Sequence, residues 1–188
     1  MKLAVIDTET TELTPTLGKI VEVALVTVDT ETGEIRRMFN MLAHPRLSRA
    51  EVERTWIVQS GHISLDEIIK ARHNAVVAFG LRHHLGKLPW TSYNVQFDYS
   101  FLKKSPWRLP PPGQDCIMAR ATHACEIPTP GPLGDEGAYK WPKLSEAYEI
   151  LVGGEFNGHR AMDDAIAAAK VMLALIKKGN YIVRELSE

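Results

Sequence analysis

The stretch Lys2–Thr10, KLAVIDTET, decides the fold and carries the first functional signal of the chain. The apolar run from Leu3 to Ile6 has no polar face, so it predicts a strand that is buried on both sides. Asp7 and Glu9 follow, and they share one face because residues two apart in a strand point the same way. Two ionised carboxylates there repel each other unless a cation joins them, and oxygen ligands favour Mg²⁺ or Mn²⁺. The alternative is a strand that ends at the surface with two solvated acids.

Length and composition are those of an ordinary globular protein. The 188 residues, of which 45% are apolar and 24% charged, predict a single domain over residues 1–188. No apolar run approaches the about 20 residues of a membrane span, and the N-terminus leads directly into a strand. Cys116 and Cys125 form no disulfide framework, which favours a reducing compartment. We therefore expect a cytoplasmic protein that does not associate with a membrane.

The charge balance does not by itself point to a partner. The chain has 22 basic and 23 acidic residues, so a nucleic-acid partner would need local basic clusters, or metal ions that reverse the sign of an acidic site.

Local patterns predict an α/β order of elements. Strands are expected over 20–28 and 34–42, and the turn residues between them predict that the first three strands form an antiparallel meander. A short strand candidate covers 88–93. Residues 115–122 are ambiguous between strand and helix, and 126–142 predict a long loop rich in proline and glycine.

Helices are expected where caps precede a helical apolar period. The pattern over 64–85 predicts one bent helix or two, beginning at a capping box. Asn94 is a good N-cap for a helix over 95–104, and further helices are expected over 143–151 and 160–178.

Two of these helices carry candidate site residues. Asp98 shares an apolar stripe with Phe101, where a carboxylate is costly unless it is paired, although it could also serve the positive end of the helix. His159 lies in the loop just before the last helix, where capping or packing is its alternative role. Helix phase places Asp164 beside the buried stripe and Asp163 on the solvated, lysine-bearing face.

Three sequence motifs together resemble, in chain order, those of the DEDDh 3′–5′ exonuclease superfamily, which includes the proofreading subunit of bacterial DNA polymerase III, ribonuclease T and oligoribonuclease. The motifs are Asp7-Thr8-Glu9-Thr10-Thr11, Asn94-x-x-Phe97-Asp98 with Phe101-Leu102, and His159 followed by Asp164. The resemblance runs from residue 2 to about residue 175.

The resemblance implies a ribonuclease-H-like fold: a mixed five-stranded sheet, its first three strands antiparallel, flanked by helices. It also implies two Mg²⁺ or Mn²⁺ ions held by Asp7, Glu9, Asp98 and Asp164, with His159 as the general base. The expected activity is metal-dependent hydrolysis from the 3′ end of single-stranded nucleic acid, with DNA slightly favoured over RNA.

The resemblance further implies substrate contacts at Thr8, Thr10, Leu13, Asn94 and Phe97. Glu12 departs from the glycine of many relatives, which leaves the details of end recognition open. A polymerase or repair assembly is a candidate partner. Two alternatives stay open: a catalytically idle DEDDh-like module that binds nucleic acid within a larger assembly, and an unrelated metal-binding domain.

Overall fold

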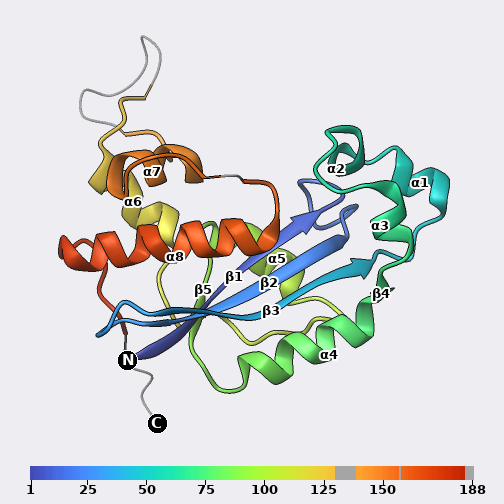
Figure 1. The fold of residues 1–188 in the computed structure, drawn as a ribbon, viewed down its shortest axis with the longest axis horizontal. Coiled ribbons are helices and arrows are strands. Elements are labelled where there is room, and N and C mark those ends of the chain that lie inside the picture. The colour runs from blue at the N-terminus through green and yellow to red at the C-terminus, as the bar shows by residue number, and fades with distance from the viewer. Residues whose placement is uncertain (130–138, 157, 185–188) are drawn as a thin grey trace.

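A five-stranded mixed sheet with helices on both faces forms the framework of the protein (Figure 1). The computed structural model describes residues 1–129, 139–156 and 158–184. The sheet order is β4-β3-β2-β1-β5, and the first three strands are an antiparallel meander. The two short outer strands run parallel to their neighbours. The strands are β1 (Lys2–Thr10), β2 (Ile20–Asp29), β3 (Ile35–His44), β4 (Arg72–His73) and β5 (Trp90–Thr91). The ribonuclease-H-like fold predicted from the sequence is confirmed.

The helices form three groups around this sheet (Figure 1). Residues 49–69, which contain three short helices, build a lobe beyond one end of β2 and β3, and its small apolar core includes Val21 of β2. Two helices cover one face of the sheet, and the last three lie on the other. The helices are α1 (Arg49–Glu53), α2 (Trp56–Gln59), α3 (Leu65–Ile69), α4 (Asn74–Leu85), α5 (Val95–Leu102), α6 (Ile117–Cys125), α7 (Leu144–Leu151) and α8 (Ala161–Lys177).

The alternation of β1 decides which layer the functional acids face. Leu3 and Val5 are fully buried in the core that contains the α8 stripe, whereas Ala4 and Ile6 are buried in the core made with α4 and α5. Because residues two apart share a face, the side chain of Asp7 continues the face that packs against α8. The strand buried on both sides, predicted from its apolar run, is confirmed.

The helical pattern over 64–85 is interrupted by a strand. The capping box at Ser64 is present and opens α3, but Arg72 and His73 then pair with the end of β3, and His73 caps α4 by accepting a hydrogen bond from the Ala75 amide. The stretch therefore holds two helices, α3 and α4, with a two-residue strand between them that the apolar period does not indicate.

Other boundaries follow local chemistry. Within the ambiguous segment 115–122, residues 117–122 lie in helix α6, and the strand candidate over 88–93 contains the strand β5. Helices α1 and α2 were not predicted, although Ser48 and Glu51 form a capping box before α1 that would have indicated it. The predicted loop over 126–142 includes residues 130–138, which lie outside the described residues. Within the described part of the chain, no helix is long and apolar enough to cross a membrane.

Candidate active site

Three carboxylates meet where β1 ends and α8 begins. Asp7 and Glu9 come from β1, and Asp164 comes from the first turn of α8. Each offers an oxygen, and these atoms all lie within 4.8 Å of one another. A hollow of about 550 Å³ opens over them and is lined by residues of β1, α5, α7 and α8 and of the segments that precede these helices. Hard oxygen ligands at this spacing fit a divalent cation such as Mg²⁺ or Mn²⁺.

Asp98 adds a fourth carboxylate from the start of α5. Asn94 caps this helix by accepting a hydrogen bond from the Phe97 amide at 3.2 Å, which places Asp98 in the first turn. The side chain of Asp98 is 3% exposed, and it accepts a 2.7 Å hydrogen bond from the hydroxyl of Thr8. The acid is therefore held against β1 and lines the same hollow.

His159 lies at the mouth of the hollow in a left-handed backbone conformation, with φ at 72°. Its amide donates a 2.9 Å hydrogen bond to Oδ2 of Asp164, which fixes the loop against the first turn of α8. A Cβ atom added to the preceding Gly158 would lie 3.2 Å from Oδ1 of Asp164, so this close approach favours glycine. The ring of His159 stacks on that of His62, with centroids 4.0 Å apart.

Burial disfavours the charged form of all four acids, and repulsion by neighbouring carboxylates adds to this at Asp7, Glu9 and Asp164. Burial is the largest cause in each case, and it raises the pKa of Glu9 to about 8 and those of Asp98 and Asp164 to about 6. Burial and the neighbouring carboxylates raise the pKa of Asp7 well above its ordinary value. The hydrogen bond from Thr8 opposes this rise at Asp98, and the His159 amide opposes it at Asp164. Bound cations would reverse the repulsion, which agrees with an ion-binding role.

The structure brings together most, but not all, of the residues predicted from the sequence. All five motif residues line the hollow, as do Thr8, Asn94 and Phe97. Thr10 does not line it: the side chain is 2% exposed, and its hydroxyl donates to the Glu12 carbonyl at 2.8 Å. Leu13 is 73% exposed outside the lining of the hollow.

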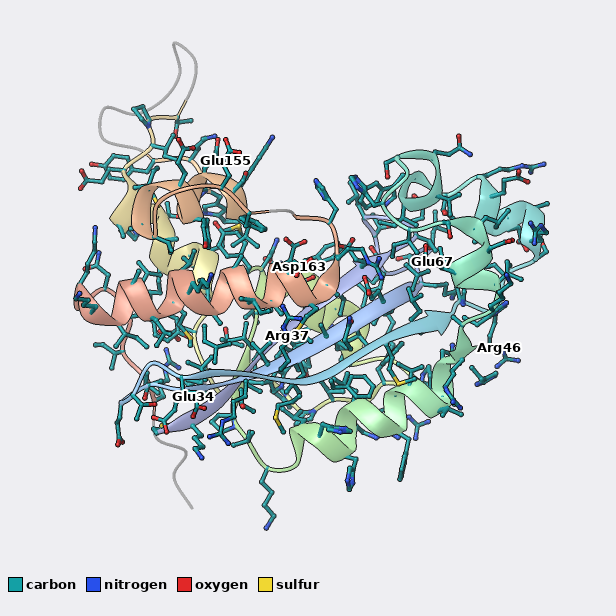
Figure 2. The ribbon with its side chains drawn as sticks, viewed as in Figure 1. Glu34, Arg37, Arg46, Glu67, Glu155 and Asp163 are labelled. Atoms are coloured by element: carbon teal, nitrogen blue, oxygen red, sulfur yellow. The ribbon has the colours of Figure 1, made fainter. Side chains whose placement is uncertain are left out.

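The two aspartates at the start of α8 separate as helix phase predicts. Asp164 joins the acidic cluster, whereas Asp163, labelled in Figure 2, lines a separate hollow that also contains Lys170. Asp163 is nevertheless half-buried and not fully solvated as predicted, because its hollow is also walled by Tyr148 of α7 and Arg37 of β3. Helix phase indicates the direction of a side chain but not which distant elements cover it.

Sequence reasoning missed four residues beside the acids. Among the described residues that line the hollow, Lys143 alone is a lysine or arginine. His62, from the lobe, stacks on His159, and Arg160 forms an ion pair with Glu22 of β2. Glu22 had a visible signal, since it is a carboxylate within an otherwise apolar strand sequence, IVEVALV, and it is 1% exposed. His62 had no comparable signal.

The fold and the site together define a class of protein. A meander that leads into a mixed sheet, with an acidic hollow where β1 ends, is the arrangement of ribonuclease-H-like exonucleases. The chain belongs to the RNase T exonuclease family (DEDDh family), which matches residues 4–172. Comparison of the chain with curated proteins found no match.

Solved structures of nucleases share the fold. Cell-death related nuclease 4 (CRN-4) is 20% identical with a TM-score of 0.63, and the match covers 96% of this chain and 65% of that chain. The nuclease domain of 3′hExo, a DEDDh family member bound to rAMP, is 20% identical with a TM-score of 0.61, over 98% of this chain and 96% of that domain. E. coli Exonuclease I, in complex with a dA16 oligonucleotide, is 18% identical with a TM-score of 0.61, and the match covers 94% of this chain and 41% of that chain. The chain thus spans less than two thirds of CRN-4 and less than half of Exonuclease I.

Proposed function

We propose that this protein is a metal-dependent 3′–5′ exonuclease that hydrolyses single-stranded nucleic acid. The observation that carries the proposal is the convergence of oxygens from Asp7, Glu9 and Asp164 within 4.8 Å, beside the buried Asp98. Four carboxylates in one hollow are costly to assemble without cations, so their grouping favours an ion-binding function over a purely structural one.

The four acids would hold two Mg²⁺ or Mn²⁺ ions. Asp7, Glu9 and Asp164 are close enough to share one ion, and Asp7 and Asp98 would hold the second. Bound there, such ions supply a nucleophilic water at neutral pH and stabilise charge on the leaving oxygen. The role of the chain would be to fix the ligand oxygens, and the hydrogen bonds to Asp98 and Asp164 support this role.

His159 is the proposed general base. It lines the hollow with the acids and is exposed, so its imidazole can take a proton from the attacking water and return it to solvent. The backbone hydrogen bond from His159 to Asp164 couples the position of the base to that of an ion ligand.

The proposed substrate is the 3′ end of single-stranded nucleic acid, with DNA favoured over RNA. Phe97 offers a ring for base stacking and Lys143 a charge for a phosphate, and both line the hollow. We also propose that Leu13 contacts the terminal nucleotide from its exposed loop.

Residues 1–188 would act as one cytoplasmic exonuclease domain. A polymerase or repair assembly is its candidate partner.

Digestion of matched single-stranded DNA and RNA oligonucleotides, labelled separately at each end, tests the proposal. We expect labelled mononucleotide to be released first from the 3′-labelled substrate in Mg²⁺ or Mn²⁺, faster for DNA, with no release in excess chelator. Activity in chelator would contradict the metal mechanism. Binding of the oligonucleotides without hydrolysis would instead indicate an idle nucleic-acid-binding module.

A further inference from the structure

A buried carboxylate outside the acidic cluster connects β2 to the start of α8. Glu22 is the cross-strand partner of Glu9 in the β1–β2 ladder, and it is 1% exposed. One of its oxygens, Oε2, accepts hydrogen bonds from Nε of Arg160 at 3.0 Å and from the Ala161 amide at 3.2 Å. The other, Oε1, accepts from Nη2 of Arg160 at 3.0 Å. The Arg160 side chain does not cap α8, and Glu22 accepts from the amide of the helix's first residue instead.

Arg160 also joins the lobe to this contact. Its guanidinium lies 3.7 Å from Oε1 of Glu67, which belongs to α3 and is labelled in Figure 2. A planar guanidinium that binds one carboxylate through two parallel hydrogen bonds has little freedom to rotate. The beginning of α8 is therefore fixed to β2 on one side and contacts α3 on the other.

The acid that completes the cluster lies one helical turn further on. The Asp164 amide donates to the Arg160 carbonyl at 3.0 Å. The position of the Arg160 backbone therefore determines the position of the Asp164 backbone, and with it the place from which the Asp164 side chain extends. Glu9 lies opposite Glu22 in the sheet. Glu9 and Asp164 are therefore linked through Glu22 and Arg160. A displacement of the Glu22–Arg160 contact thus changes the separation between Asp164 and the β1 acids.

We propose that Glu22 and Arg160 are a pair of positioning residues that hold Asp164 at ion-binding distance from Asp7 and Glu9. The pair also keeps Glu22 from acting as an ion ligand, because both of its carboxylate oxygens already accept hydrogen bonds from Arg160 or the Ala161 amide. This inference rests on the proposed exonuclease function and names the residues that assemble its ion site.

The test compares Arg160→Lys, Glu22→Gln and the double variant Glu22→Gln/Arg160→Gln with the wild-type protein. Lysine keeps the charge but loses the two-point hydrogen bond, and the double variant removes both charges, so that neither is left buried and unpaired. Glu34→Gln and Arg36→Lys form the matched control, since this exposed ion pair of 2.7 Å lies at the far end of the sheet from Glu67 (Figure 2).

Three measurements separate positioning from folding: kcat and KM on a 3′-labelled oligonucleotide, Mn²⁺ affinity without substrate by electron paramagnetic resonance, and thermal unfolding by circular dichroism. For the single variants we expect about a 10- to 100-fold loss in kcat or Mn²⁺ affinity with KM little changed, as for other partners that orient metal ligands. The double variant should regain thermal stability without regaining kcat, and the Glu34 and Arg36 variants should match wild type.

Recovery of kcat together with stability in the double variant would show a purely structural pair and overturn the inference. Wild-type kcat and Mn²⁺ affinity in folded single variants would overturn it as well. Failure of the proposed function is distinguishable, because a wild-type protein that binds Mn²⁺ without cutting the oligonucleotide still allows the positioning effect to be measured through ion affinity.

Discussion

The hydroxyl of Thr8 donates a 2.7 Å hydrogen bond to Oδ1 of Asp98, and both side chains are buried. This contact joins β1 to α5 across 90 positions of sequence. Its consequence is that the Thr8 side chain, expected from the motif to contact substrate, supports an acid of the site. Thr8 still lines the hollow, so a direct contact with substrate stays a prediction.

Replacing Thr8 with valine should therefore lower kcat more than it changes KM. Valine keeps the shape of threonine but removes the donor, and the pKa of Asp98 should then rise above about 6, because this hydrogen bond lowers it. We expect about a 10- to 100-fold loss of activity, as for other groups that orient metal ligands. Thr8→Ser keeps the donor and is the control. Equal activity of the valine and serine variants would contradict a supporting role for the hydroxyl.

Asp163 and Asp164 provide a matched pair of adjacent carboxylates. Asp164→Asn should abolish exonuclease activity and weaken divalent-ion binding, because an oxygen of Asp164 lies within 4.8 Å of those of Asp7 and Glu9. The same variant should raise the melting temperature of the metal-free protein by relieving carboxylate repulsion. Asp163→Asn should remain active. If the asparagine at 163 proves inactive and that at 164 active, the assignment of the third motif is wrong.

The stability of the metal-free protein should fall as pH rises. The pKa of Glu9 is raised from 4.5 to about 8, so the folded protein binds more protons than the unfolded chain between these values. The free energy of unfolding then decreases with increasing pH across this window. Melting temperatures measured in chelator should decline from about pH 5 to about pH 8. Mg²⁺ should reduce this decline, and so should Glu9→Gln. A melting temperature that increases over the window would contradict the raised pKa values.

His159→Ala should lose about 10²- to 10⁴-fold in kcat while Mn²⁺ binding survives. The ring is the proposed proton acceptor, whereas the substitution keeps the backbone amide that contacts Asp164. The exposed His123 of α6, outside the hollow, provides the control His123→Ala. Activity of His159→Ala within a few-fold of wild type would mean that another group accepts the proton.

Lys143→Gln should raise KM for oligonucleotides and weaken its dependence on salt, with a smaller effect on kcat. Lys143 lines the hollow at the start of α7, where its charge can contact a phosphate of the bound strand. Lys87, exposed beyond the end of α4, provides the control Lys87→Gln. An unchanged KM and salt dependence at position 143 would exclude this contact.

Local patterns determined much of the fold and the outline of the site. The apolar run of β1, the turn after β2 and the Asn94 cap each depend on residues close together in sequence, and each is present in the structure. Helix phase likewise selected Asp164 over Asp163 for the acidic cluster, because the 3.6-residue period is a property of the helix alone.

Tertiary structure decided which side chains support the acids. Arg160 and Glu22 are 138 positions apart, and the stacking of His62 on His159 depends on how the lobe packs beside α8. The partner of a buried polar group is set by which elements meet in space, and no local period records that choice. The motifs therefore predicted which acids and which histidine meet in one hollow, whereas the partners that hold these residues in place could be identified only in the folded protein.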